Sequence, residues 1–198
     1  MSSAVTVDSV ILIGRNNIKQ CWVVFISNEN KQVPLWFQAS GDPEQDGLVV
    51  WDYHVIMIQD LSDFKGEGTF QDSSSEALVW DLDSTLTFPT PFGQYAEKAL
   101  KAGEEINAAF TKLYRVISGA VYLDSFASDR GHMRNSSGEW MSPPPSYPPI
   151  VAKDGCVNNI HRFWDMSDRA DRADCNDNFG RVLSEKELLQ KFGSALGP

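Results

Sequence analysis

LVVWDYHVIMIQ, residues 48–59, is an almost continuous run of apolar side chains rich in β-branched and aromatic residues. This composition is typical of a strand in the middle of a sheet. Alternation of side chains along such a strand places His54 on the same face as Asp52, Ile56 and Ile58. The stretch therefore predicts a buried strand that carries one histidine.

Segments on both sides of residues 48–59 have the same β-rich character. Upstream, CWVVFISNENKQVPLWFQ (residues 21–38) predicts two strands around a polar turn. Downstream, ALVWDL (residues 77–82) predicts another strand. Because short connections rather than helices join these strands, we expect antiparallel pairing instead of a parallel βαβ sheet.

Helical patterns follow in the second half of the chain. Residues 92–117 have apolar positions three and four apart, which predicts a helix interrupted at Gly103. Ser184 begins a capping-box pattern for a last helix that ends at Gly193. The proline-rich residues 141–150 exclude a helix there. Together these patterns predict an α+β fold with a mostly antiparallel sheet flanked by helices.

Composition restricts the class of protein. The formal net charge of −10 disfavours binding to nucleic acid, because phosphate backbones are also negative. Three cysteines are too few, and odd in number, for a disulfide framework, and they fit a reducing compartment. Residues 1–14 have no basic start and only a short apolar run, so they predict neither a secretory signal nor a membrane span. We therefore expect a soluble intracellular protein.

ALVWDLDSTL, residues 77–86, contains two aspartates that allow a first hypothesis. Phosphatases of the haloacid dehalogenase class have a similar stretch, in which Asp81 would be the nucleophile, Asp83 the general acid, and Mg²⁺ would lie beside them. That chemistry requires a lysine, further carboxylates and a parallel, doubly wound sheet. The antiparallel pattern disfavours this alternative.

His54 and Asp81 allow a second hypothesis. If their strands are antiparallel neighbours, the two side chains can meet on one face. An aspartate that accepts the imidazole N–H fixes the tautomer and stabilises the imidazolium, as in a nucleophilic triad. The alternative is a core histidine whose hydrogen bonds are merely satisfied. The residue pattern leaves both open.

Six segments between residues 21 and 193 resemble, in the same order, the family of protein N-terminal glutamine amidohydrolases. They are CWVVFISNENKQVPLWFQ, VVWDYHVIMI, VWDLDSTLTFPTPF, RVISGAVYLDSFASDRGHM, SSGEWMSPPPSYPPI and RVLSEKELLQKFG. The resemblance implies one domain over residues 21–198 with a papain- or transglutaminase-like architecture. It also implies a Cys-His-Asp triad in which His54 is the histidine and Asp81 the aspartate, with no metal or cofactor.

The resemblance further implies a monomeric enzyme of the cytoplasm and nucleus. Its partners would be proteins or peptides with N-terminal Gln, which it converts to Glu as a step towards degradation that depends on the N-terminal residue. It implies no nucleic acid or membrane partner. A free N-terminus is positively charged below its pKa of about 7.7–8.0, so a carboxylate should bind it. Asp52, Asp83 and Asp129 are candidates by residue type.

The nucleophile is the one part of the triad that has no counterpart. In the family it lies in a Cys-Tyr-Cys-Glu-Glu-Asn-like segment, which residues 1–20 do not resemble. Cys21 matches a different family cysteine, and Cys156 and Cys175 lie in loops without a transferable role. We therefore expect residues 1–20 to be an atypical segment and the chain as written to lack the nucleophile and be inactive. A non-catalytic binder of N-terminal Gln is the alternative.

Overall fold

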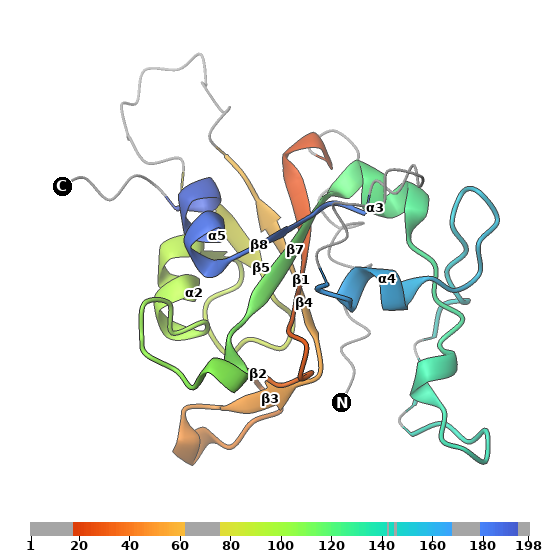
Figure 1. Ribbon diagram of the computed structural model, residues 1–198, viewed down its shortest axis with the longest axis horizontal. Coiled ribbons are helices and arrows are strands. Elements are labelled where there is room, and N and C mark those ends of the chain that lie inside the picture. Colours follow the sequence, from red (N-terminus) through yellow and green to blue (C-terminus); the bar gives the residue numbers. More distant parts are fainter. Residues whose placement is uncertain (1–17, 62–75, 142, 145, 168–178, 194–198) are drawn as a thin grey trace.

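A six-stranded antiparallel sheet forms the centre of the fold in this computed structural model, which describes residues 18–61, 76–141, 143–144, 146–167 and 179–193 (Figure 1). In spatial order its strands are β6 (Thr90–Pro91), β5 (Leu78–Trp80), β4 (His54–Gln59), β1 (Cys21–Ser27), β7 (Leu113–Ser118) and β8 (Arg181–Leu183). A separate pair consists of β2 (Val33–Leu35) and β3 (Val49–Trp51). The predicted α+β class with antiparallel pairing is confirmed, whereas the papain-like architecture stays a prediction.

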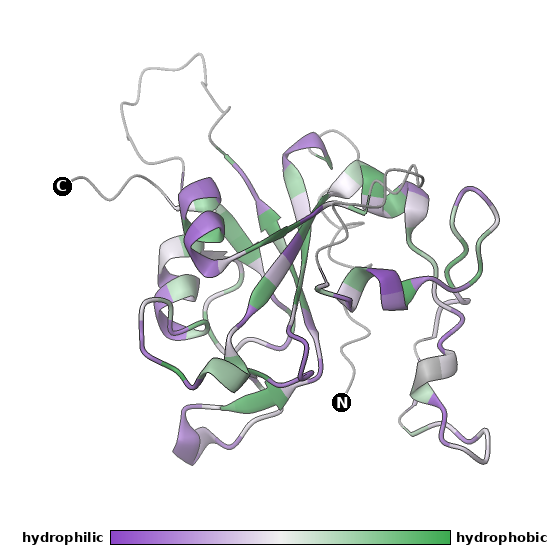
Figure 2. Ribbon diagram, in the orientation of Figure 1, coloured by the Kyte–Doolittle hydropathy of each residue, from purple (hydrophilic) through white to green (hydrophobic). Residues whose placement is uncertain are grey.

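Helices cover both faces of the sheet. They are α2 (Phe92–Lys98) and α5 (Glu185–Phe192) on one face, and α3 (Gly119–Ser125) and α4 (Ile160–Trp164) on the other (Figure 1). Ile58 and Val79 pack on the α2–α5 face, and Phe25 and Met57 pack on the α3–α4 face. Hydrophobic residues run through the sheet between the helices (Figure 2). Each such buried side chain stabilises the fold by about 1.5–3 kcal/mol.

Residues 48–59 form two strands, so the single strand predicted there was wrong. The chain bends at Asp52, whose carboxylate accepts a hydrogen bond from the Tyr53 backbone N–H at 2.9 Å. Ser27 Oγ donates to the Asp52 carbonyl at 2.8 Å and holds the bend against β1. As a result β3 leaves the main sheet to pair with β2, and β4 alone continues in it.

Residues 92–117 are only partly helical, so the prediction of a helix interrupted at Gly103 was wrong for the second half of this segment. After α2 the chain passes Gly103, where φ is +82°, and a short 3-10 turn η3 (Ala108–Phe110). It then forms β7, which pairs with both β1 and β8. The segment favours a strand because Tyr114 and Ile117 each have a separate hydrophobic cluster to enter on opposite faces.

The last helix agrees with its sequence pattern. Ser184 Oγ accepts a hydrogen bond from the Glu187 backbone N–H, and the Glu187 carboxylate accepts one from the Ser184 backbone N–H. This completes the predicted capping box, and the C-cap of α5 is Gly193. No helix in the described ranges is long and apolar enough to cross a membrane.

The FASDRGHM and PPPSYPPI segments belong to one structural unit. Arg130 donates from its guanidinium to the carbonyls of Tyr147 and Pro148 at 2.6 and 3.1 Å. Ser128 and Ile150 exchange backbone hydrogen bonds at 2.9 and 3.1 Å. These contacts satisfy the backbone of a proline-rich stretch that cannot form a helix.

Candidate active site

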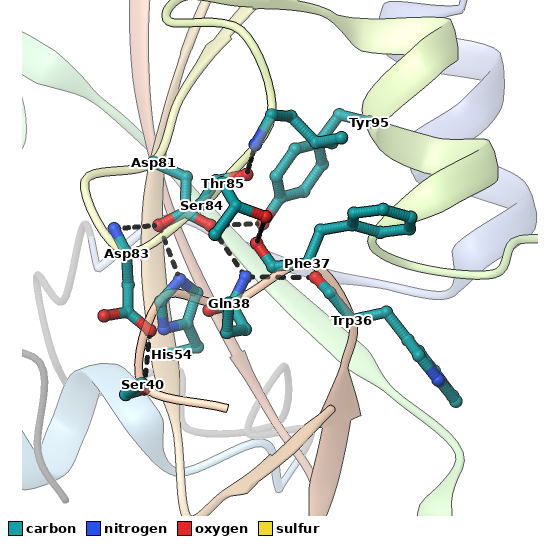
Figure 3. Close-up of polar contacts among 11 residues, drawn as sticks. Trp36, Phe37, Gln38, Ser40, His54, Asp81, Asp83, Ser84, Thr85 and Tyr95 are labelled. Carbon is teal, nitrogen blue, oxygen red and sulfur yellow. Dashed lines mark hydrogen bonds and ion pairs between the residues drawn. The ribbon is translucent and has the colours of Figure 1, made fainter. Parts of the chain in front are cut away.

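Strand pairing brings His54 and Asp81 together. β4 and β5 are antiparallel neighbours in which Ile58 lies opposite Val79. Alternation from these two residues places His54 and Asp81 on the same α2–α5 face. His54 Nε2 lies 3.0 Å from Asp81 Oδ1, and the two residues are only 1% and 3% exposed (Figure 3). The sequence-predicted contact between them is therefore present.

The Asp81 carboxylate accepts four hydrogen bonds. Oδ1 accepts from His54 Nε2 and from the Asp83 backbone N–H, both at 3.0 Å. Oδ2 accepts from the Tyr95 hydroxyl at 2.8 Å and from Gln38 Nε2 at 3.3 Å (Figure 3). The donors come from β4, the turn after β5, helix α2 and the loop after β2. Each oxygen thus has two partners from different parts of the fold.

Hydrogen bonding keeps Asp81 ionised despite its burial. Burial acts to raise the pKa of the carboxyl, but the charge and hydrogen bond of His54 and the hydrogen bonds from Tyr95 and Asp83 outweigh it, so the pKa is lowered. An ionised carboxylate can only accept, so His54 Nε2 must be the donor. In the neutral ring the other nitrogen, Nδ1, therefore carries no proton.

His54 Nδ1 is the free side of this pair. It is buried, and no described residue forms a hydrogen bond with it. The ring stacks against Trp51, with centroids 5.1 Å apart and planes inclined by 34°. An oriented, unprotonated imidazole nitrogen can accept a proton from a nucleophile placed beside it.

Trp51, Tyr95 and Gln38 were missed by the sequence analysis. Strict alternation would place Trp51 on the face opposite His54, but the bend after β3 brings it onto the same side. Tyr95 and Gln38 lie 14 and 43 residues from Asp81 in sequence, and only the folded chain brings them to it. A glutamine at the end of the apolar run VPLWFQ was the only signal available.

The three candidate partners for a substrate ammonium have different surroundings. Asp83 Oδ2 accepts a hydrogen bond from Ser40 Oγ at 2.8 Å. Asp129 Oδ1 accepts from Asn158 Nδ2 at 2.7 Å and from the Gly131 backbone N–H at 2.8 Å. Asp52 is exposed and lies at the bend two residues before His54. Of the three, Asp52 combines exposure with proximity to His54 along the chain.

Cys21 lies at the opposite end of the sheet from His54. Within the β1–β4 pair, Cys21 is opposite Gln59, whereas Ile26 is opposite His54. Five residues of strand correspond to about 17 Å. Cys21 also packs on the α3–α4 face, and burial raises the pKa of its thiol. A nucleophilic cysteine needs the reverse, a lowered pKa next to its base.

The other cysteines add no nucleophile in the described residues. Cys156 lies in the loop before α4, where its backbone N–H donates to Asp154, and it does not contact His54 Nδ1. Cys175 lies outside the described residues, as do residues 1–17. The thiol of the expected triad therefore has no counterpart beside His54 in the part of the chain that is described.

The geometry of Asp81 contradicts the phosphatase alternative. A phosphate-accepting aspartate needs an open carboxylate oxygen, which must reach the phosphorus atom. Asp81 is buried and each of its oxygens already accepts two hydrogen bonds. The surrounding sheet is also antiparallel. The hydrogen bonds of Asp81 instead fix its carboxylate as the acceptor for His54 Nε2–H.

Comparisons with known proteins identify relatives of this chain. The sequence model of the family described as N-terminal glutamine amidase matches residues 7–192, so the match begins inside the segment 1–20. Three relatives carry the name protein N-terminal glutamine amidohydrolase. They are from Arabidopsis thaliana (43% identical over 146 residues, 74% of this chain and 62% of the relative), Bos taurus (39% over 177 residues, 89% and 75%) and Oryza sativa subsp. indica (47% over 182 residues, 88% and 74%). The chain thus spans 62% of the Arabidopsis relative and about three quarters of the other two.

Proposed function

Because the chain belongs to the N-terminal glutamine amidase family, we propose that His54 and Asp81 serve the hydrolysis of the side-chain amide of an N-terminal glutamine. The products are an N-terminal glutamate and ammonia. The observation that carries this proposal is the buried His54–Asp81 hydrogen bond, which leaves His54 Nδ1 without a partner among the described residues.

The proposed reaction is an acyl transfer with a cysteine nucleophile. His54 Nδ1 takes the proton of the thiol, and the sulfur attacks the side-chain carboxamide carbon. The imidazolium returns the proton to the amide nitrogen, which leaves as ammonia when the tetrahedral intermediate collapses to a thioester. Nδ1 then takes a proton from water, whose oxygen attacks the thioester carbon and breaks the carbon–sulfur bond. The imidazolium returns this proton to the departing sulfur, so glutamate is released and the thiol is restored. Asp81 stabilises the imidazolium in both steps.

The nucleophile itself is the open part of the proposal. No described cysteine contacts His54 Nδ1, and Cys21 lies on the other face of the sheet. Removal of a triad nucleophile costs about 10⁶-fold in turnover. We propose that these 198 residues do not deamidate on their own and that activity requires a cysteine placed against Nδ1.

A second candidate function follows from the same observation. Since His54 Nδ1 has no thiol partner among the described residues, the chain can act as a non-catalytic binder of N-terminal glutamine. Its recognition of the α-ammonium group is assigned to Asp52, because that residue is exposed and lies two residues before His54 in the chain. The proposal treats Asp83 as a structural residue, because it bonds Ser40 and supports Asp81.

The remaining expectations stay proposals. They are a monomer in the cytoplasm and nucleus, proteins with N-terminal Gln as partners, and a role upstream of degradation that depends on the N-terminal residue. Analytical ultracentrifugation of the purified chain would test the monomer, and imaging of the tagged protein in cells would test the localisation.

Two measurements on the unmodified chain separate the two candidate functions. Ammonia release from a peptide beginning with Gln reports turnover, and calorimetric titration with the same peptide reports binding. A peptide beginning with Glu is the control ligand. We expect binding of the Gln peptide without ammonia release, and weaker binding in Asp52→Asn. A chain that binds neither peptide, and releases no ammonia, would contradict both candidates.

A further inference from the structure

Tyr95 holds the side of Asp81 that faces away from His54. The tyrosine lies in the middle of α2 and is fully buried, and its hydroxyl donates to Asp81 Oδ2 at 2.8 Å (Figure 3). Its carbonyl accepts hydrogen bonds from the backbone N–H groups of Ala99 and Leu100 at the end of the helix. The hydroxyl is therefore fixed by the helix as well as by core packing around the ring.

The Tyr95 hydroxyl is a permanent donor. Burial, and then the negative charge of Asp81, raise the pKa of this phenol well above its ordinary value. It therefore keeps its proton at neutral pH. Asp81, whose pKa is lowered, keeps its charge and accepts. The pair is thus a charge-assisted hydrogen bond with fixed roles.

The direction of Asp81 Oδ1 depends on what holds Oδ2. A carboxylate can rotate about its Cβ–Cγ bond unless both oxygens are held. Gln38 Nε2 also donates to Oδ2, but at 3.3 Å and while sharing its protons with the Trp36 carbonyl. The Tyr95 bond is shorter and is the only one that this hydroxyl donates. Of the two donors to Oδ2, Tyr95 is therefore the stronger restraint on that rotation, and the Asp83 backbone N–H restrains Oδ1.

We propose that Tyr95 is a positioning residue, which holds Asp81 so that Oδ1 points at His54 Nε2 and His54 Nδ1 stays free to accept a proton. The importance of this role rests on the proposed function, but the orientation itself can be measured without catalysis. The alternative is that Tyr95 only fills the core and that its hydroxyl uses Asp81 as a convenient acceptor. The two possibilities differ in what happens to His54 when the hydroxyl is removed.

The test is NMR of the full chain labelled with ¹⁵N-histidine and ¹³C-aspartate. In the wild-type protein we expect a protected His54 Nε2–H proton and an unprotonated Nδ1. In Tyr95→Phe, which preserves the ring, the Nε2–H signal should be lost to exchange with water, and the Asp81 carboxyl should titrate at a higher pH. An unchanged Nε2–H signal and Asp81 titration in a folded Tyr95→Phe protein would overturn the proposal.

Tyr114→Phe is the matched control. Tyr114 is also a fully buried tyrosine, but its hydroxyl has no hydrogen-bond partner among the described residues and does not contact Asp81. Its removal should leave both signals unchanged. If Tyr114→Phe altered them as much as Tyr95→Phe, the effect would be one of general core packing and the proposal would be wrong.

A second variant covers the case in which Tyr95→Phe does not fold. Gln38→Met removes the weaker donor and leaves Tyr95 alone on Oδ2, so the His54 Nε2–H signal should persist. Its loss in Gln38→Met would assign the positioning role to Gln38 instead. A wild-type His54 that carries its proton on Nδ1 would contradict the proposed function itself, which distinguishes that failure from failure of the Tyr95 proposal.

Discussion

The two ends of the β1–β4 pair bury groups of similar accessibility with opposite chemical results. At one end Cys21 is 1% exposed among apolar side chains, and burial raises the pKa of its thiol. At the other end Asp81 is 3% exposed, yet the charge and hydrogen bond of His54 and the hydrogen bonds from Tyr95 and the Asp83 backbone outweigh burial and lower its pKa. Desolvation therefore keeps the Cys21 thiol protonated, whereas hydrogen bonds to the Asp81 carboxylate prepare the His54 end for proton transfer.

The largest expected effect on stability comes from removing the Asp81 carboxylate at the His54 end of the sheet. Asp81→Ala would leave His54, Tyr95, Gln38 and one backbone N–H without their acceptor. Each buried donor left unsatisfied costs about 1–3 kcal/mol, so the total for several donors exceeds the cost of losing any single bond. We expect urea denaturation to show this combined loss in the free energy of unfolding.

The matched control for Asp81→Ala is an exposed ion pair. Lys153 Nζ lies 3.2 Å from Asp124, with side chains 76% and 63% exposed. Surface pairs of this kind contribute about 0–1 kcal/mol, so Asp124→Ala should change stability by no more than that. Equal losses in Asp81→Ala and Asp124→Ala would contradict the description of Asp81 as a buried anchor.

A smaller effect is expected when only one donor to Asp81 is removed. A hydrogen bond to a charged group contributes about 1.5–3 kcal/mol, so Tyr95→Phe should lower the free energy of unfolding by that amount. Tyr114→Phe removes a hydroxyl without a described partner and should be neutral or slightly stabilising. Chemical denaturation gives the free energy of unfolding of both variants. If Tyr114→Phe lowered it as much as Tyr95→Phe, the loss could not be attributed to the hydrogen bond with Asp81.

The contributions of Asp81 and Cys21 to folding stability should be lost at opposite ends of the pH range, at acid pH for Asp81 and at alkaline pH for Cys21. Asp81 has a lowered pKa in the folded state, so its contribution to stability is present above the unfolded value of about 3.9 and is lost as the pH falls below it. Cys21 has a raised pKa, so stability is lost as the pH rises above the unfolded thiol value of about 8.5. Each slope is at most about 1.4 kcal/mol per pH unit.

Variants assign these slopes to their residues. Asp81→Asn should flatten the acid limb of stability against pH, and Cys21→Ala should flatten the alkaline limb, with each variant leaving the other limb intact. Denaturation midpoints measured across the pH range provide the check. An acid limb that survives in Asp81→Asn would show that other carboxyl groups dominate there.

The sequence predicted the His54–Asp81 contact because alternation along two strands is a local rule. Prediction from the sequence failed where contacts between distant residues determine the local structure. At Asp52 a bend held by Ser27 divides one apolar run into two strands. At Tyr114 a helix-like spacing became β7, because β1 and β8 offered pairing on both sides. Tyr95 and Gln38 could not be assigned to Asp81, since nothing in their own neighbourhood indicates which distant carboxylate they reach.

The central claim is that the His54–Asp81 pair activates a cysteine for deamidation of N-terminal glutamine. Its most direct test joins a segment with the Cys-Tyr-Cys-Glu-Glu-Asn-like sequence expected for the family ahead of Cys21 and measures ammonia release from a peptide beginning with Gln.

The claim predicts ammonia release by this chimera, its loss in chimeric His54→Ala, and its retention in chimeric His161→Ala, which changes an exposed histidine of α4. It also predicts no release by the unmodified chain. Robust deamidation by the unmodified chain that disappears in Cys21→Ser would contradict the claim, because the nucleophile would then lie at the end of the sheet assigned here to packing.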